Sequence, residues 1–403
     1  MWSLFAQGNK GEFLYCFKPH IARMHYRHHY IDLLSGRKVA SSISRFLSDL
    51  HEVPLSATFE KPKVIHLSYE LGHIFHDQLD LIPGHTPLAI EIEYLKCARV
   101  QLSDLWSGNY VAPRLKFLQV PTWDDYGVSF DRIQEELLCG NAYQVNLTAP
   151  FYLVYEDSYR PSDFIRHLWS DQSRIAPYAH ATYLSNLGKL ILSNSPECLV
   201  QRRVREDHVE LYSMPIKGTL PLQDGDNAQS VWLKMLESKK EVGELNMITD
   251  LIRNDLSRVA EPRSRVVSKR LPLQVPGILH QYALVSCSVP IETTWGRVLE
   301  CLFPGGSVTG APKKSSLNII NQVETESRGH YCGSTWFAYK KTLAASINIR
   351  TAEIDLGLKE MKYGAGGGVT LKSHKHSEFE EMLRKSESFL SPFLPRNIKH
   401  RVP

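Results

Sequence analysis

Four glutamates form two closely spaced pairs that lie far apart in the chain. Glu241 and Glu244 are three residues apart, as are Glu378 and Glu381. On a helix, this spacing places both carboxylates of a pair on one face. Two such faces brought together offer an oxygen-rich site that suits a hard cation such as Mg²⁺. The same pattern also fits two solvated acidic helix faces, so the pairs alone leave both interpretations open.

Lys217 precedes both pairs, inside a segment 215–219 that reads Pro-Ile-Lys-Gly-Thr. A lysine at such a place is either a solvated charge at a strand end or, when buried beside acidic groups and a metal, a nucleophile or base. Its surroundings therefore decide which chemistry the chain can perform.

A glycine-rich segment, residues 304–313, leads into a predicted helix over 311–324. Backbone N–H groups of such loops and helix starts bind phosphate or carboxylate. The Gly-x-x-x-x-Gly-Lys-Ser/Thr spacing of a nucleotide-binding loop is absent, and a structural turn is the alternative interpretation. The candidate anion-binding residues of this segment are Gly306, Ser307 and Thr309.

A second set of candidate anion ligands lies closer to the C-terminus. Arg350 follows the apolar run 346–349, and an arginine at the inner end of a strand can clamp a carboxylate with two N–H groups. Residues 364–368 read Gly-Ala-Gly-Gly-Gly, and their bare backbone can also bind an anion. A surface ion pair is the alternative for Arg350.

The elements that must position these residues indicate a mixed fold. Residues 1–120 contain short apolar runs separated by turn residues, which is typical of strands. Strands and helices then follow without regular βαβ alternation, so the pattern predicts an α+β fold rather than a doubly wound sheet. We expect helices over 129–139, 226–259, 311–324 and 376–389, strands over 143–147 and 342–351, and two strands within 188–219 around a charged hairpin at 202–207.

Length and composition bound the class of protein. The chain has 403 residues, more than one compact core normally holds, and its net charge of +4 is too small to indicate nucleic acid as a partner. No run approaches the ~20 apolar residues of a membrane helix, and the N-terminus lacks the pattern of a signal peptide. The seven scattered cysteines contain no Cys-x-x-Cys pair, which favours reduced thiols in a cytoplasmic protein.

A series of ordered motifs resembles the chorismate-utilising enzymes. This family includes anthranilate synthase component I, aminodeoxychorismate synthase component I, and the isochorismate and salicylate synthases. So many motifs in one order are far more specific than any one of them. The matching segments are 140–147, 195–197, 215–219, 244–259, 305–313, 331–334, 346–351 and 364–368 with the glutamates that follow, so the resemblance covers about residues 125–390.

The resemblance implies a substrate, a cofactor and roles for the candidate residues. The substrate would be chorismate, which carries two carboxylates. Mg²⁺ would bridge its ring carboxylate to Glu244 and Glu381, with Glu241 and Glu378 nearby. The other implied roles are a ring-carboxylate pocket completed by Gly366, Gly368 and Lys385, a clamp on the enolpyruvyl carboxylate by Arg350, and protonation of the leaving C4 hydroxyl by Glu197.

Two positions sort the members of this family by reaction. Members that add water at C2 carry a lysine where this chain has Gln144, so the resemblance argues against isochorismate or salicylate synthesis. Anthranilate synthases resemble Pro-Ile-Ala-Gly-Thr at 215–219, whereas aminodeoxychorismate synthases carry a lysine at the position of Lys217. In those enzymes the lysine amine is thought to attack C2 as the hydroxyl leaves C4, after which ammonia adds at C4. The resemblance thus favours conversion of chorismate and ammonia to 4-amino-4-deoxychorismate, towards 4-aminobenzoate and folate.

The ammonia source is expected on another protein. The sequence contains no Gly-x-Cys-x-Gly nucleophile motif, so a separate glutamine amidotransferase subunit is implied. The resemblance also implies a composite, two-lobed fold with large antiparallel sheets. Its expected parts are an N-terminal region at 1–120, a catalytic domain at 125–390 and a basic tail at 391–403.

Three positions depart from the family pattern. Ala283 stands where histidine is usual, and His280, expected one helical turn earlier, is a candidate to replace it. Phe337 stands where a tyrosine usually assists Arg350, and Leu222 stands where arginine is usual. The alternatives left open are therefore an anthranilate synthase component I and a non-catalytic homologue that binds chorismate.

Overall fold

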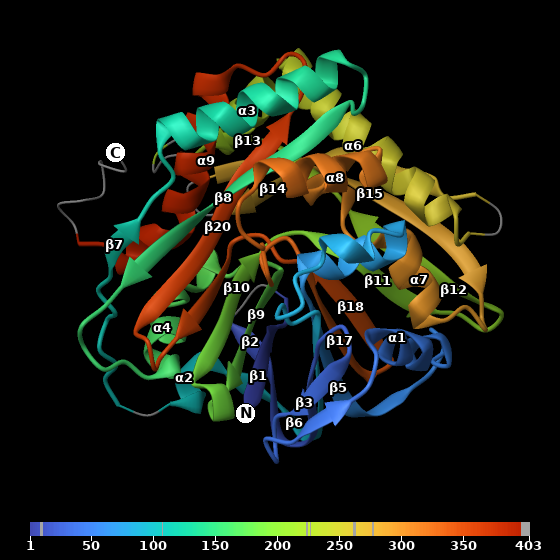
Figure 1. Ribbon diagram of the computed structural model, residues 1–403, viewed down its shortest axis with the longest axis vertical. Helices are drawn as coiled ribbons and strands as arrows, with labels where there is room; N and C mark the ends of the chain where they lie inside the picture. Colours follow the sequence, from blue (N-terminus) through green and yellow to red (C-terminus); the bar gives the residue numbers. More distant parts are fainter. Residues whose placement is uncertain are drawn as a thin grey trace.

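The computed structural model is built around one antiparallel sheet (Figure 1). It describes residues 1–8, 11–106, 108–222, 225, 227–260, 263–275 and 278–395. The strands before residue 120 are β1 (Trp2–Ala6), β2 (Glu12–His25), β3 (His29–Asp32), β4 (Lys38–Ala40), β5 (Phe59–Leu67), β6 (Ala89–Gln101) and β7 (Lys116–Gln119). The later strands are β8 (Gln144–Val154), β9 (Tyr178–Leu184), β10 (Lys189–Ser195), β11 (Cys198–Val204), β12 (His208–Met214), β13 (Ile216–Pro221), β14 (Arg265–Val275), β15 (Ile278–Pro290), β16 (Gly310–Ala311), β17 (Ser334–Lys340), β18 (Thr342–Ile347), β19 (Thr351–Asp355) and β20 (Glu360–Val369).

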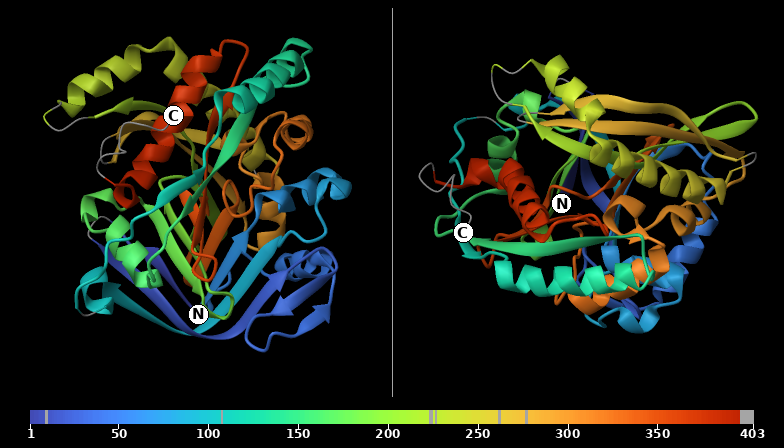
Figure 2. Two further views of the ribbon diagram at one scale, coloured as in Figure 1. Left: turned by 60° about the vertical axis from the view of Figure 1, so that its left-hand side comes forward. Right: turned by 90° about the horizontal axis from the view of Figure 1, so that it is seen from above.

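Helices gather mainly at one end of the sheet, as Figures 1 and 2 show for α3, α6, α8 and α9. This segregation of helices from an antiparallel sheet confirms the predicted α+β class. The described helices are α1 (Ile43–His51), α2 (Leu102–Leu105), α3 (Trp123–Leu138), α4 (Pro161–Leu168), α5 (Ala228–Glu237), α6 (Lys239–Ser257), α7 (Trp295–Leu302), α8 (Lys313–Val323) and α9 (Lys375–Leu390).

Strand pairing joins the two expected parts of the chain in a single sheet. The N-terminal strands β1, β2, β6 and β5 lie between β9 on one side and β17 on the other. From there the sheet continues through β10, β19, β20 and β8 in one direction, and through β18, β11, β12 and β15 in the other. Residues of 1–120 and 125–390 therefore share backbone hydrogen bonds, and the boundary between the two expected parts remains a prediction.

Apolar residues lie on both faces of β1 and of the second half of β5. Leu4 belongs to the main hydrophobic cluster, whereas the next residue, Phe5, belongs to a second and smaller cluster. Likewise, Val64 belongs to the second cluster and its neighbour Ile65 belongs to the main cluster. Successive side chains of a strand point to opposite faces, so β1 and the second half of β5 lie between two apolar clusters.

Several predicted elements have different bounds in the structure. Helix α3 begins six residues before the predicted start, because Thr122 caps it by accepting a hydrogen bond from the Asp125 N–H. The region predicted as one helix over 226–259 contains α5 and α6, since Ser238 ends the first and caps the second. Residues 188–219 contain parts of four strands rather than two, although the predicted hairpin between β11 and β12 is present.

The predicted strand 342–351 is interrupted after Ile347. Arg350 has a φ of 51°, which is the left-handed region that a strand cannot continue through. Strand β19 starts at the next residue. The predicted helices over 311–324 and 376–389 correspond to α8 and α9 within two residues. Most of the tail at 391–403 lies outside the described residues.

Candidate active site

One pocket collects most of the residues that the sequence singled out. It lies where β13, β15, β20, α6 and α9 meet the loop after β18. The predicted site residues that line it are Glu197, Lys217, Glu241, Glu244, Ser307, Arg350, Gly366, Gly368, Glu378, Glu381 and Lys385. These residues come from both ends of the expected catalytic domain and are brought together only by the fold.

Lys217 reaches the pocket from an irregular point in β13. Ile216 pairs with Tyr282 and Thr219 pairs with His280, so the register shifts between them. Gly218 has a φ of 89° at this bulge, a conformation that glycine adopts without strain. A Cβ placed on Gly368 would lie 3.1 Å from the Lys217 amine and 2.5 Å from Gln144 Nε2. The lysine amine therefore lies against the glycine-rich strand β20 and lines the pocket.

Glu197 lies in the turn between β10 and β11, and only 3% of it is exposed. Burial raises the pKa of this carboxyl to about 7, and the Ser307 hydroxyl and the Lys217 charge oppose that rise. Oxygen Oε1 of Glu197 accepts no hydrogen bond from the described residues. A carboxyl that keeps its proton near neutral pH and has a free oxygen in a pocket can act as a general acid.

Arg350 is a partly buried cation whose charge is not neutralised by any described carboxylate. Burial lowers its pKa, and the Tyr363 ring opposes this only in part. Its Nη2 lies 2.7 Å from Nε2 of His280. A guanidinium in such surroundings attracts an anion, and its planar fork matches a carboxylate. The alternative of a surface ion pair is wrong for Arg350.

The four glutamates line the pocket from α6 and α9, as their spacing predicted. Glu378 accepts a hydrogen bond from Ser373 Oγ at 2.8 Å, and Glu381 pairs with Lys385 Nζ at 2.8 Å. Lys385 Nζ also donates to the Gly366 carbonyl at 3.0 Å. Glu241 faces β13, since a Cβ on Gly218 would lie 2.9 Å from its Oε2.

The arrangement of these glutamates suits a hard cation that is shared with a bound anion. Within the described residues, no group of three or more His, Cys, Asp or Glu is arranged to hold a metal ion by itself. Mg²⁺ usually binds through one or two carboxylates together with substrate oxygens and water, rather than through a complete protein cage. An all-oxygen set spread around a pocket therefore fits Mg²⁺ that is held jointly with an anionic ligand.

Three predicted binding residues lie behind the pocket surface. Gln144 is buried, with its amide packed at Gly368 and its Nε2 without a hydrogen-bond partner in the described chain. Gly306 packs against Leu251 of α6, which leaves no room for a side chain. Thr309 is fully buried, and its carbonyl accepts from the Asn146 N–H at 2.9 Å. Of the predicted loop residues, Ser307 is thus the one that reaches the pocket.

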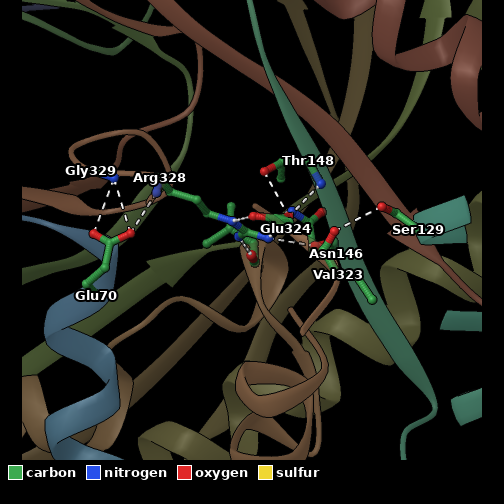
Figure 3. Close-up of polar contacts among 9 residues, drawn as sticks. Glu70, Ser129, Asn146, Thr148, Val323, Glu324, Arg328 and Gly329 are labelled. Carbon is green, nitrogen blue, oxygen red and sulfur yellow. Dashed lines mark hydrogen bonds and ion pairs between the residues drawn. The ribbon is translucent and has the colours of Figure 1, made fainter. Parts of the chain in front are cut away.

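A buried ion pair that sequence reasoning missed supports the pocket wall (Figure 3). Arg328 and Glu324 pair at 2.7 Å, with side chains 3% and 8% exposed. Arg328 also donates to the carbonyls of Val308 and Asn146, which both line the pocket. Glu324 accepts from the N–H and hydroxyl of Thr148. The Glu-x-x-x-Arg spacing was a usable signal, but it occurs equally on exposed helices.

The three residues that depart from the family pattern, Ala283, Phe337 and Leu222, lie in different surroundings. His280 does not lie one helical turn from Ala283, because both are on strand β15. His280 lines the pocket, whereas the Ala283 N–H donates to the Pro215 carbonyl. Phe337 stacks on Phe5 with centroids 4.4 Å apart in the second cluster and is not among the residues that line the pocket. Leu222 is buried.

Comparison with known proteins gives the context for this pocket. The model of a family described as chorismate binding enzyme matches residues 109–391. The chain is 33% identical to aminodeoxychorismate synthase component 1 of Escherichia coli (strain K12) over 272 residues, which cover 67% of this chain and 57% of the relative. It is 32% identical to the protein of that name in Salmonella typhimurium over 298 residues, covering 71% and 63%. The matched part thus spans about three fifths of these relatives.

Solved structures superpose on a larger share of the chain, but at lower sequence identity. Anthranilate synthase component I of Streptococcus pneumoniae TIGR4 superposes with a TM-score of 0.75 at 18% identity, covering 95% of this chain and 93% of the other. The menaquinone-specific isochorismate synthase of Escherichia coli gives a TM-score of 0.69 at 15% identity, covering 97% and 88%. At such identities the likeness establishes the antiparallel fold alone. Among the described helices, none is long and apolar enough to span a membrane.

Proposed function

The chain belongs to the chorismate binding enzyme family, and on that premise we propose that it is the chorismate-aminating component of an aminodeoxychorismate synthase. The reaction would convert chorismate and ammonia to 4-amino-4-deoxychorismate, on a route to 4-aminobenzoate and folate. The observation that carries this proposal is the Lys217 amine, which lies in the same pocket as the protonatable carboxyl of Glu197 and the unneutralised Arg350.

Arg350 would hold the enolpyruvyl carboxylate, because its remaining N–H donors face a pocket without a competing carboxylate partner in the described chain. The glutamates on α6 and α9 would hold Mg²⁺ together with the ring carboxylate of chorismate. When bound, Mg²⁺ supplies the positive charge that offsets the repulsion between these carboxylates.

The first step would form a bond between Lys217 Nζ and C2 of the ring. The ring double bonds shift, the C4–O bond breaks, and the proton of Glu197 passes to the departing hydroxyl to give water. Burial keeps Glu197 protonated up to a pH of about 7, which is what this role requires. In the second step ammonia bonds to C4, the double bonds shift back, and the C2–N bond breaks to release the neutral lysine. The carboxylate of Glu197 then takes up the proton lost by the new ammonium group.

Ammonia would come from a glutamine amidotransferase subunit. The word component in the relatives' names supports a second subunit. Free ammonium at high concentration would replace it in the test tube, so the amination chemistry can be tested with this chain alone.

The decisive experiment measures the products from chorismate, Mg²⁺ and ammonium, with and without an added aminodeoxychorismate lyase. We expect 4-amino-4-deoxychorismate from the wild type, and 4-aminobenzoate only when the lyase is present. Fluorescent anthranilate formed without the lyase would instead identify an anthranilate synthase. Binding of chorismate without any product would identify a non-catalytic homologue.

The variant Lys217→Ala tests the covalent step. We expect its kcat to fall at least about hundredfold while chorismate still binds, because the variant loses the nucleophile but keeps Arg350. Lys217→Arg is a matched control that keeps the charge without a neutral amine, and it should be equally inactive. Unimpaired turnover by Lys217→Ala would rule out the lysine adduct.

A further inference from the structure

His280 is the side chain that contacts Arg350, and it lies three residues before Ala283, one of the departures from the family pattern. Its Nε2 lies 2.7 Å from Arg350 Nη2, and the ring is 6% exposed. Arginine has N–H donors and no acceptor, so the facing His280 nitrogen must accept and must carry no proton. The imidazole therefore orients the guanidinium without adding a further positive charge beside it.

The other side of the same ring is tied to the backbone at Gly218. A hydrogen bond between His280 and the Gly218 backbone acts on the imidazole, and it favours the protonated ring in opposition to burial and Arg350. Since Nε2 accepts from Arg350, the proton of the neutral ring is on Nδ1 and can be donated to this backbone. One imidazole thus joins Arg350 to the residue that follows Lys217.

The backbone at this point departs from regular strand pairing. Thr219 pairs with His280 and Ile216 pairs with Tyr282, which leaves Lys217 and Gly218 in the bulge between these two registers. Gly218 has a φ of 89° and can adopt many conformations. A side chain that fixes the Gly218 backbone therefore also limits where the Lys217 amine can point.

We propose that His280 is a positioning residue that couples the carboxylate clamp at Arg350 to the strand bulge that presents Lys217. This inference rests on the proposed function, in which Arg350 holds one end of chorismate and Lys217 attacks the ring. Arg350 uses one of its five N–H donors on His280, so the rest of its fork stays free for a carboxylate. The distance between the clamp and the nucleophile is then set by one rigid ring.

Two variants separate the two contacts of the ring. In His280→Gln the amide oxygen reaches about as far as Nε2 and can still accept from Arg350, but the contact with Gly218 is lost. In His280→Asn the shorter amide takes the place of Nδ1 and can still donate to Gly218, but the contact with Arg350 is lost.

For His280→Gln we expect kcat to fall about tenfold or more with KM for chorismate within about threefold of the wild type. For His280→Asn we expect KM to rise about tenfold or more with a smaller change in kcat.

Binding gives a second measurement that does not depend on turnover. Calorimetric titration with chorismate and Mg²⁺, without ammonium, should show weaker binding for His280→Asn and nearly unchanged binding for His280→Gln. The same two substitutions at His208, a partly exposed histidine at the start of β12 and outside the pocket, serve as matched controls and should change neither affinity nor rate. Melting temperatures of all four variants report on folding.

Equal losses in both parameters for both variants, no loss in either, or the reverse pattern would each overturn the coupling. If a variant does not fold, His280→Ala with and without added imidazole replaces it. Restored turnover or affinity supports the coupling, and an absence of rescue refutes it. If the wild type binds chorismate but forms no aminodeoxychorismate, the proposed function fails, and the calorimetric comparison alone still decides the role of His280.

Discussion

Two arginines near the same pocket, Arg328 buried and Arg350 partly buried, have opposite surroundings. Arg328 forms an ion pair with Glu324, donates to two backbone carbonyls and lies 4.3 Å from the centre of the Tyr69 ring. Arg350 has no carboxylate partner among the described residues, and its side-chain contact is a neutral imidazole. Burial acts to lower the pKa of both. At Arg328 the Glu324 carboxylate outweighs it and raises the pKa, whereas at Arg350 the pKa stays lowered.

This difference distinguishes a structural charge from a functional one. A buried ion that is fully paired holds the wall in place, and its removal leaves its partner uncompensated. A buried ion that lacks its counter-charge is costly in the free protein and is compensated when an anion binds. The same contrast holds between Glu324, which accepts from Arg328 and Thr148, and Glu197, whose Oε1 accepts nothing from the described chain.

The largest expected effect is on stability, from Arg328→Met. Glu324 would remain buried without its counter-ion, and the free energy of unfolding should fall by about 3–5 kcal/mol. Urea denaturation measures this. The double variant Arg328→Met with Glu324→Met removes both charges and should recover most of the loss. A single variant as stable as the wild type would end the structural interpretation of Arg328.

The matching substitution Arg350→Met should affect binding rather than folding. Methionine is also unbranched at Cβ, so the cost of the φ of 51° should be similar. We expect chorismate to bind about a hundredfold more weakly, since two charge-assisted hydrogen bonds are lost. The free energy of unfolding should stay the same or increase, because an uncompensated, partly buried charge is removed. A loss of stability comparable to that of Arg328→Met would remove the contrast between the two arginines.

The pH dependence of turnover tests the corresponding contrast between carboxyls. The pKa of Glu197 is raised to about 7 by burial, so kcat/KM should fall about tenfold per pH unit above that value as the proton donor is lost. An unfolded glutamate titrates near 4.3, so the folded state binds this proton more tightly. Burial of Glu197 should therefore reduce stability as the pH rises from about 4 to 7, and Glu197→Gln should abolish that part of the pH dependence. A rate that is constant from pH 6 to 9 would exclude Glu197 as the acid.

The smallest expected effect comes from an arginine-to-methionine substitution in an exposed ion pair. Arg45 lies 3.1 Å from Asp49 on α1, with side chains 74% and 58% exposed. Water already solvates both charges, so Arg45→Met should change the free energy of unfolding by no more than about 0.5 kcal/mol and leave chorismate binding unchanged. A larger effect would mean that the losses at Arg328 reflect loss of the side chain rather than of a buried charge.

Much of the candidate site could be predicted from the sequence because its signals are local. The glutamate pairs depend on spacing within one helix, and both pairs reach the pocket from α6 and α9. Helix α9 was predicted within one residue at each end, since its periodicity is regular. The break at Arg350 could not be predicted, because a positive φ at an arginine has no signal in composition. Gly306 and Thr309 were assigned to the pocket because a glycine-rich loop resembles an anion site. In the structure Gly306 packs against Leu251, and the Thr309 carbonyl accepts a hydrogen bond from the Asn146 N–H.

The sequence by itself determined the family, the α+β class and the set of residues able to do chemistry, because motif order and short spacings survive without coordinates. Only the tertiary structure decided which of these residues are charged, neutral, paired or free. Arg328 and Arg350 are the same residue type 22 positions apart, and their difference arises from contacts with Glu324 and His280 that are set by helix and sheet packing. His280 lies 70 residues from Arg350 in the chain, and the sheet joins their strands through the pairing of β15 with β12, β12 with β11 and β11 with β18. Burial and pairing are properties of such long-range contacts, so they depend on the fold and not on local sequence.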